Sequence, residues 1–332
     1  MVANEEILRL AQAGLETTRG TGVAATRKVY AQITPSFERA IREFTDTSGS
    51  FSARRRLAYQ RQRVSFAVTE LLTFEDWAWW LQLAVKGGVT GVSDAGTPPG
   101  YLYTFTPSLA TDDLKSVTLE WNHVGNAYES TQVMVNSFTV RIDPDNEGGW
   151  MLDADLLARD LATTTYTGSI SDRSTEVIKA PTTKLYIDDT TIGSTQVTAK
   201  LISASVTGNN NIHFKAFAED EAAFAANKVG RAQRTYNAQL VLEFDDDAEF
   251  AKYRAAAGTK RYVKLLTEGS QIHGSPATPK YASIEMNGYW ESISWGNREG
   301  NIIATFGLSC FYDATSGYDA QFKVLNALAT LP

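Results

Sequence analysis

The pattern of apolar and polar positions predicts a chain built mainly from β-strands. In residues 63–72, Val64, Phe66 and Val68 alternate with polar or small residues, which is typical of a half-buried strand. Similar runs predict further strands near residues 27–33, 101–106, 115–122, 132–142, 149–158, 197–206, 261–267, 281–287, 289–295 and 302–312. Residues 151–161 fit a helix as well as a strand, because their apolar positions satisfy both periods.

Residues 73–86 have helical periodicity instead. Thr73 is a suitable N-cap, and Asp76 follows three positions later as an acidic variant of the capping box. The apolar stripe at helical spacing comprises Phe74, Trp77, Trp80, Leu81 and Ala84. The three tryptophans of so short a helix cannot all face one way, so Trp79 is a candidate for a subunit contact. We expect a second, shorter amphipathic helix at residues 4–12.

A long polar stretch, residues 36–62, separates two expected strands. A structureless loop of this length is uncommon in a compact domain, so we interpret the stretch as a long hairpin or projecting arm. Its arginines are candidates for contacts with another copy of the chain: Arg39, Arg42, Arg54, Arg55 and Arg56. The run Arg54–Arg56 favours docking on an acidic face of another copy over binding to nucleic acid, because the rest of the chain is acidic.

The second half of the chain repeats the order of elements in the first half. Residues 234–257 match residues 61–84 in kind, since both contain an alternating strand followed by an acidic helix start and an aromatic helix. An offset of 173 places Val68 on Val241 and Trp77 on Phe250. The pattern predicts a duplicated β-rich domain, residues 1–170 and 171–332, each copy with a flanking α-helix and a long projecting loop. Two unrelated β-rich domains are the alternative.

The composition excludes several classes of protein. The chain has 332 residues, of which 43% are apolar, so it can bury a core and is not a disordered chain. A single cysteine, Cys310, excludes a disulfide framework. No apolar run reaches the roughly 18 residues of a membrane helix, and Glu5 and Glu6 do not fit a secretory signal. We therefore expect synthesis in the cytoplasm.

The charge is unevenly distributed. The net charge is −7, which argues against a general nucleic-acid coat. Residues 1–63 contain 11 Lys and Arg against 6 Asp and Glu, whereas the remaining residues contain 20 against 32. The sequence thus combines a basic arm with an acidic body.

Candidate catalytic and metal-binding motifs are scarce. The three histidines, His123, His213 and His273, lie far apart in the sequence and outside any metal-ligand motif. The segment Asp143–Gly148 spaces its carboxylates like the first half of a calcium loop, but Ala154 stands where the bidentate glutamate is expected. A β-turn between two strands is the simpler interpretation, and an ion at Asp143 and Asp145 stays open.

A second acidic cluster comprises Asp245, Asp246 and Asp247. It is compatible with a metal or acid–base site, but an acidic residue cluster at a helix start is the simpler interpretation, because it interacts favourably with the helix dipole. The same three residues are candidates for a subunit contact.

Several segments together resemble the tail tube proteins of long-tailed bacteriophages. They are GLETTRGT (14–21), the strand–helix unit 63–86, YTFTPS (103–108), KSVTLEW (115–121) and VNSFTVRID (135–143), and their order matches that family over about residues 14–160. The second half resembles a further copy of the same tube domain, so the resemblance implies two tandem β-sandwich or tube-type domains. The individual motifs are loose, and the resemblance comes from their co-occurrence in order.

The resemblance implies a structural virion protein of the phage tail, made in the host cytoplasm, with no enzymatic activity and no cofactor. In that family, strands of neighbouring subunits join into a barrel around an acidic lumen, and long loops reach the adjacent ring. The tape measure protein and the translocating DNA occupy the lumen without tight binding. A duplicated chain implies rings of three copies with pseudo-sixfold symmetry in place of hexamers.

Two other classes of function stay open. A β-sandwich that binds carbohydrate or acts in adhesion would use exposed aromatic residues, with Trp121, Trp150, Trp290 and Trp295 as candidates. A hydrolase would use carboxylates, with Asp143, Asp145 or Asp153 as candidates, although no paired-carboxylate motif stands out.

Overall fold

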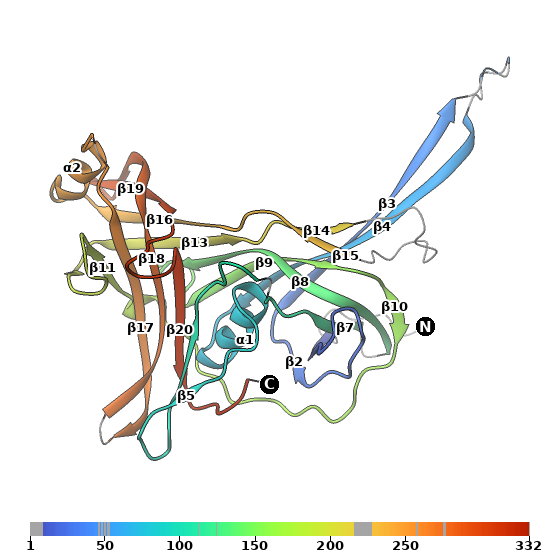
Figure 1. The fold of residues 1–332 in the computed structure, drawn as a ribbon, viewed down its shortest axis with the longest axis horizontal. Helices are drawn as coiled ribbons and strands as arrows, with labels where there is room; N and C mark the ends of the chain where they lie inside the picture. Colours follow the sequence, from blue (N-terminus) through green and yellow to red (C-terminus); the bar gives the residue numbers. More distant parts are fainter. Residues whose placement is uncertain are drawn as a thin grey trace.

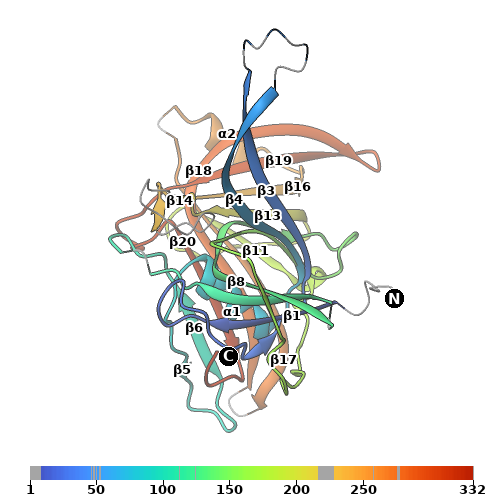
Figure 2. The same ribbon diagram turned by 90° about the vertical axis from the view of Figure 1, so that its right-hand side faces the viewer.

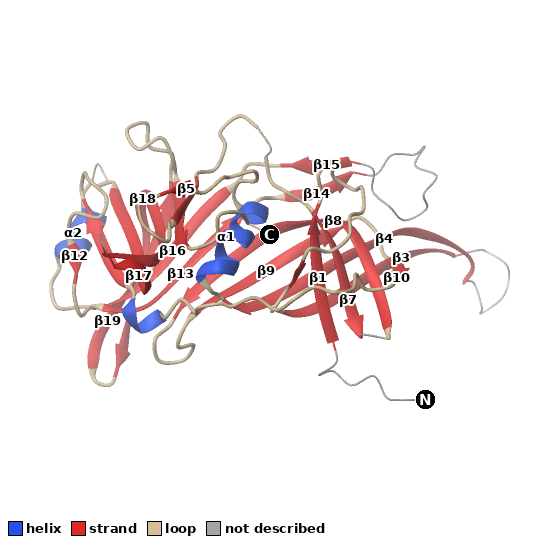
Figure 3. Cartoon of the chain, turned by 90° about the horizontal axis from the view of Figure 1, so that it is seen from below, coloured by secondary structure: helices blue, strands red, loops and turns tan. Residues whose placement is uncertain are grey.

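The chain is mainly β, as the alternating pattern predicted (Figure 1). The computed structural model describes residues 9–45, 47, 49, 51, 54–111, 113–123, 125–215, 228–256, 258–274 and 277–331. Among them are two α-helices, α1 (Phe74–Ala84) and α2 (Ala248–Arg254), and a short 3-10 helix, η2 (Ala180–Thr182). Strands dominate every view, and α1 lies near the middle of the molecule (Figure 3).

Eight antiparallel strands lie side by side in one layer. Their order is β3 (Gln32–Thr45), β4 (Arg54–Leu71), β9 (Trp150–Ala158), β8 (Asn126–Ile142), β13 (Leu201–Asn209), β16 (Thr235–Glu243), β19 (Asn301–Cys310) and β18 (Ala277–Arg298). We call this layer the eight-stranded sheet. The pairing of β8 with β13 joins the first half of the chain to the second.

The first parts of β8 and β18 leave this layer and pair with other strands. The first part of β8 lies between β10 (Ala162–Thr164) and β7 (Val117–His123), and β7 is followed by β1 (Arg9–Leu15) and β2 (Arg27–Lys28). The first part of β18 lies between β17 (Arg261–Gly274) and β20 (Ala320–Asn326). Beyond β17 follow β11 (Lys184–Asp188) and β12 (Gln196–Val197), and beyond β20 follow β6 (Tyr101–Phe105) and β5 (Val92–Ser93). A separate hairpin contains β14 (Ile212–Lys215) and β15 (Lys228–Arg231).

The order of strand pairing in the first half recurs in the second. The series β1, β7, β8, β9, β4, β3 corresponds to β11, β17, β18, β19, β16, β13. The register also shifts at corresponding places, at Asn136 between β8 and β9 and at Glu291 between β18 and β19. A bulge adds one residue to one strand of a pair. Because the two bulges lie at the same place in the recurring pairing order, they align the two halves residue by residue.

The register corrects the offset of 173. Aligned through the two bulges, Phe66 falls on Ala238 and Val68 falls on Leu240, all of them buried. Val241, the partner expected from the sequence, lies on the opposite face of the sheet. Side chains of a strand alternate between faces, so a shift of one residue is incompatible with the burial of Val68.

Helix α1 forms the centre of the core. Thr73 caps it as predicted, since its side chain accepts a hydrogen bond from the Asp76 backbone N–H at 3.0 Å. The helix lies between the eight-stranded sheet and strands β20 and β6, and all of its residues are buried. The Trp77 ring lies 6.5 Å from Phe138 of β8 and 6.1 Å from Phe322 of β20. Helix α2, in contrast, has no buried residue.

The predicted surface role of Trp79 is wrong for this fold. Its side chain is 2% exposed and packs edge-to-face on Trp80, with ring centroids 4.8 Å apart. Because protein layers cover α1 on every side, the helix has no outward face. Trp79 therefore presents no surface to another copy.

Other expectations fell on β-structure or outside the described residues. Of the helix expected at 4–12, residues 4–8 lie outside the described residues, and Arg9 begins β1, so the remainder of that prediction is wrong. The ambiguous segment 151–161 is strand as far as Ala158. Most of the polar stretch 36–62 belongs to β3 and β4, which form a hairpin that projects from the body (Figures 1 and 2).

Candidate functional site

One face of the eight-stranded sheet is polar, whereas the other packs on the core. Alternate residues of every strand reach this polar face; serine, threonine, asparagine and glutamine are the main residue types. The pairs Ser137–Asn209, Thr139–Thr207 and Ser205–Gln239 illustrate the pattern in the centre of the sheet. Their immediate neighbours in sequence, such as Phe138 and Val206, are buried. The sheet thus presents one continuous, largely hydrophilic surface, in which Leu71, Met151 and Val241 are apolar exceptions.

The charges on the polar face nearly balance. It carries the carboxylates Glu38, Asp153, Asp155 and Glu243 and the guanidiniums Arg63, Arg141 and Arg298. Arg141 donates to Asp153 at 2.6 Å and also pairs with Glu147, and Arg298 pairs with Asp145. A surface that attracts nucleic-acid phosphates needs more lysines and arginines than carboxylates, and the described residues of this face have no such surplus.

Hydroxyl groups satisfy the carboxylates at the centre of this face. Thr69 donates to Asp153 at 2.9 Å, and Ser137 donates to Asp155 at 2.9 Å. These side chains line a shallow depression of about 180 Å³. Asp153, one of the candidate hydrolytic residues, is thus held by Thr69 and by Arg141.

The other two candidate carboxylates of the hydrolase hypothesis stabilise local structure. Asp143 accepts the backbone N–H groups of Asp145 at 3.0 Å and of Asn146 at 3.2 Å, which confirms the predicted turn between β8 and β9. Asp145 pairs with Arg298 across the halves. Within the described part of the chain, no group of three His, Cys, Asp or Glu side chains is placed to hold a metal ion.

The two outer strands of the sheet have open edges. Among the described residues, β3 pairs only with β4, and residues 289–298 of β18 pair only with β19. Phe37 on β3 is 45% exposed and Trp295 on β18 is 49% exposed. An exposed edge is a template for another strand, and natural proteins normally cover or blunt it.

A groove lies beside the base of β3. It has a volume of about 500 Å³ and is lined by β1, by residues 28–35 and by the end of β7. Tyr30, Ile33, Pro35 and Trp121 contribute its apolar surface. The Phe37 ring continues this surface, because it stacks on Trp121 with centroids 5.9 Å apart.

The candidate arginines lie along the β3–β4 hairpin. Arg39, Arg42 and Arg56 are exposed, and the Arg42 guanidinium lies 5.4 Å from the centre of the Phe44 ring. Arg54 and Arg55 are the first two residues of β4, and Arg54 pairs with Thr45 of β3. The side chains of Arg54 and Arg55 lie outside the described residues. Sequence reasoning therefore located these residues on one projecting element.

The acidic cluster lies at the start of α2, as expected. Lys200 pairs with Asp246 at 2.6 Å and with Asp245 at 3.4 Å, and Asp247 is the N-cap residue. The Asp246 carboxylate also accepts the Ala248 backbone N–H at 3.0 Å. The cluster thus begins a helix and pairs with a lysine of the same half, and its carboxylates stay more than half exposed.

Most of the tryptophans expected for carbohydrate binding are buried. Trp121, Trp150 and Trp290 are at most 7% exposed, and Trp150 and Trp290 donate hydrogen bonds to Thr183 and Glu249. Trp295 alone of the four is exposed, and its ring packs edge-to-face on Phe244 and Phe250. The four rings do not share one surface.

Two histidines have described side chains, and they lie in different surroundings. His213 is exposed on β14, whereas His273 is buried and its Nε2 lies 2.9 Å from the Asp94 carboxylate. The hydrogen bond from His273, with the Gly96 and Gly100 backbone N–H groups, lowers the pKa of Asp94. His123 ends β7, and its side chain lies outside the described residues.

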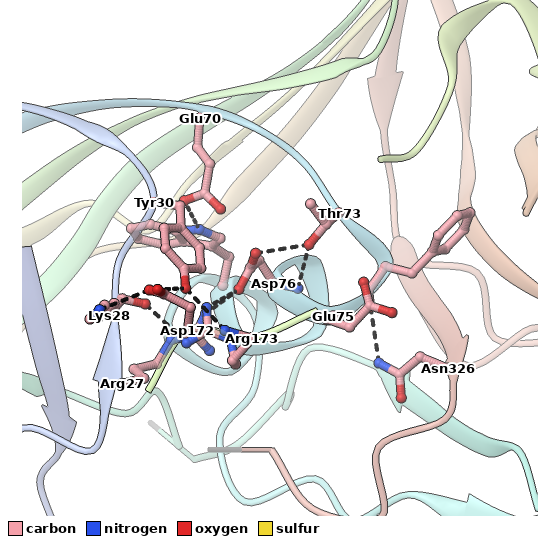
Figure 4. A network of polar contacts seen from close by, with 12 residues as sticks. Arg27, Lys28, Tyr30, Glu70, Thr73, Glu75, Asp76, Asp172, Arg173 and Asn326 are labelled. Atoms are coloured by element: carbon pink, nitrogen blue, oxygen red, sulfur yellow. Dashed lines mark hydrogen bonds and ion pairs between the residues drawn. The ribbon is translucent and has the colours of Figure 1, made fainter. Parts of the chain in front are cut away.

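A buried polar network fixes α1 in place, and sequence reasoning missed it (Figure 4). Arg27 and Arg173 both pair with Asp76, the latter at 2.5 Å, and Arg27 lies 4.1 Å above the Trp79 ring. Burial lowers the pKa of Arg27 to about 10. The network joins β2, α1 and the segment that connects the two halves. The capping position of Asp76 was visible in the sequence, but its two partners lie 49 and 97 residues away.

Glu70 belongs to the same buried region. Trp80 donates its indole N–H to the Glu70 carboxylate at 2.8 Å. Burial, together with the nearby charge of Asp76, raises the pKa of Glu70 to about 7. Glu70 is therefore the titratable group of this network whose charge changes near neutral pH.

Neither helix among the described residues has the length and apolar character that crossing a membrane requires. No protein-family model matches the chain, and a comparison with curated proteins gives no match.

Proposed function

We propose that the chain is a structural subunit that assembles with copies of itself into rings, and that stacked rings form a tube like that of a bacteriophage tail. One observation carries the proposal: a continuous polar sheet face ends on both sides in open strand edges. Open edges at opposite ends of one sheet favour head-to-tail association, and a closed ring removes them.

Two tandem tube-type domains, residues 1–170 and 171–332, would each contribute four strands to the wall of the ring. The recurring pairing order of β3, β4, β9, β8 and β13, β16, β19, β18 supports this division. Because β8 and β13 already join the halves inside the chain, three copies would supply six equivalent domains. We therefore propose rings of three copies with pseudo-sixfold symmetry.

The polar face would line the lumen. Its hydroxyl and amide groups and its nearly balanced charges support a hydrophilic wall that does not retain phosphate groups. This differs from the acidic lumen that the resemblance implied, because the face itself carries almost as many arginines as carboxylates. DNA and an extended tape measure protein would move along such a wall without tight binding.

The β3–β4 hairpin would contact the adjacent ring. It projects beyond the body and carries Arg39, Arg42 and Arg56 on exposed positions (Figure 2). The acidic remainder of the chain provides a complementary surface, since electrostatic complementarity fixes the orientation of a docked partner.

Electron microscopy of the purified protein over a range of concentrations tests the proposal. We expect rings at moderate concentration and tubes of constant diameter at high concentration. A chain that stays monomeric at high protein concentration, with no rings in any image, would contradict the proposed function.

A further inference from the structure

We infer that the β18–α2 end of one copy docks against the edge and groove of β3 in the next copy, and that this contact reproduces the junction between the two halves inside the chain. The inference rests on the proposed self-assembly and names the surfaces that meet. It follows from the correspondence of β18 with β8, of β3 with β13 and of α2 with α1.

The internal junction provides the template. There β8 pairs with β13 from Ser137–Asn209 to Ile142–Ala204. On the polar face, the hydroxyl oxygens of Thr139 and Thr207 lie 2.9 Å apart. On the core face, Val140 and Val206 oppose each other and both are fully buried.

Helix α1 completes the internal junction by packing on the other half. Its Trp77 contacts Phe322 of β20, and the Phe74 carbonyl accepts a hydrogen bond from the Asn326 side chain at 2.9 Å. The corresponding α2 has no such cover, since Tyr253 is 40% exposed and the Phe250 ring packs on the exposed Trp295. The second half thus ends in the aromatic surface that the first half buries.

The receiving surface is the groove beside β3. It is concave, and Tyr30, Pro35 and Trp121 give it an apolar surface next to the polar side chains of Lys28 and Asn122. The groove lies next to the open edge of β3. Because β3 corresponds to β13, this edge corresponds to the edge of β13 that pairs with β8 of the first half. An aromatic side chain next to the β18 edge of the neighbouring copy would therefore enter this groove.

Transfer of the internal register predicts which residues meet. The two bulges and the ladder pairs align Thr139 with Ser294 and Thr207 with Ser36, so Ser294 of one copy faces Ser36 of the next. In the same register Trp295 lies opposite Pro35, beside the groove. Ile293 lies opposite Phe37, where the internal junction has Phe138 opposite Gly208.

The transferred ladder has one fewer hydrogen bond than its template. Pro35 takes the place of Val206 and has no backbone N–H. Burial of the half-exposed Trp295 ring supplies apolar contact at the same position.

Disulfide cross-linking tests the register. In a Cys310→Ala background, we expect the double variant Ser36→Cys, Ser294→Cys to form intermolecular disulfides in mild oxidant, seen as a ladder of multimers on non-reducing gels. The Thr139–Thr207 template predicts that these side chains oppose each other closely enough for a disulfide. The control double variant Gln32→Cys, Ser294→Cys shifts the cysteines four residues, about 13 Å along the strand, and should give no ladder.

A second variant tests the aromatic contact. Trp295→Ser should raise the concentration needed for assembly roughly tenfold or more, because buried aromatic anchors dominate interfaces. The control Leu109→Ser removes an apolar side chain outside the docking surface that is 68% exposed, against 49% for Trp295, and should leave assembly unchanged. Circular dichroism of both variants checks that the monomer is folded.

The outcomes separate this inference from the proposed function. Rings that form while Ser36→Cys, Ser294→Cys gives no more cross-link than its control would overturn the inference and leave the function standing. Normal assembly of a folded Trp295→Ser variant would also overturn it. A wild-type chain that never associates would overturn both.

Discussion

At the scale of single residues, the buried ion cluster around Asp76 is the most consequential feature. One carboxylate, 1% exposed, faces the guanidiniums of Arg27 and Arg173. Burying charges is costly unless they are paired, so the cluster tolerates the loss of a partner poorly. It fixes the entry of α1 relative to the segment that connects the two halves.

Replacing Asp76 should therefore destabilise the monomer strongly. Asp76→Asn removes the carboxylate that pairs with both guanidiniums, and we expect the free energy of unfolding to fall by about 3–5 kcal/mol. Urea unfolding followed by tryptophan fluorescence measures this change. Asp172→Asn removes an exposed partner of Lys28 and should change stability little. Equal stability of Asp76→Asn and the wild type would show that the cluster does not hold the fold.

Glu70 should make stability depend on pH. Its pKa in the folded chain is raised to about 7, so between its ordinary value near 4.5 and pH 7 the folded state retains a proton that the unfolded state has lost. Stability from this group is therefore fully present below pH 4.5 and falls as the pH rises to 7.

The variant Glu70→Gln isolates this dependence. The difference in free energy of unfolding between wild type and variant should shift against the wild type by about 3 kcal/mol from pH 4.5 to pH 7.5. Urea unfolding at several pH values, with both proteins in identical buffers, gives the difference. A difference independent of pH would mean that folding does not raise the pKa of Glu70.

At the scale of elements, the two helices contrast most clearly. Helix α1 is enclosed by the sheet, β18, β20 and β6, whereas α2 is exposed. The pairing order places them at corresponding points of the two halves. Their different burial is explained if the partner of α2 is another copy.

Matched truncations distinguish the two helices. Trp77→Ala should lower the free energy of unfolding of the monomer by about 3–5 kcal/mol, because it leaves a large cavity in the core. Phe250→Ala should change monomer stability by less than about 1 kcal/mol and should weaken assembly instead. Urea unfolding and sedimentation velocity report the two effects. The helix account would be contradicted by a Phe250→Ala variant that unfolds like Trp77→Ala.

The projecting hairpin makes its own prediction. Changing Arg54, Arg55 and Arg56 to glutamate should weaken the stacking of rings more than folding, because the element lies outside the body (Figure 1). The charge-conserving control changes the same three residues to lysine and should retain stacking. Electron microscopy counts tubes against single rings, and normal tubes from the glutamate variant would show that these arginines do not hold rings together.

Elements with a strong local signal were predicted well from the sequence. The alternation around Val64, Phe66 and Val68 predicted β4, and the cap at Thr73 predicted the start of α1. The surface position expected for Trp79 was wrong because periodicity shows an apolar stripe and cannot reveal that a second layer covers the remaining helix face. The partners of Asp76 were missed because their contacts are distant in sequence.

The repeat shows the same limit more sharply. Order and spacing revealed two similar strand–helix units, but the offset of 173 was one residue away from the pairing that aligns Val68 with Leu240. Bulges and unequal loops change spacing without changing topology, and only the ladder register resolves them. The polar face and the two open edges likewise emerge only when strands from both halves stand in one sheet.

At the scale of the whole molecule, the eight-stranded sheet connects fold with the proposed function. Its polar face is continuous across the junction of the halves. Among the described residues, β3 has no partner besides β4, and residues 289–298 of β18 have none besides β19. A heterologous contact between two such edges generates a ring when the rotation closes and an open filament when it does not. The internal junction of β8 with β13 shows the contact that repetition would use.

Electron microscopy of face-on particles, with class averages that resolve individual subunits, tests this account most directly. It predicts a ring of three chains with six similar densities around a central opening. Single chains at every concentration, open filaments without a bore, or a ring whose subunits meet away from β3 and β18 would contradict it.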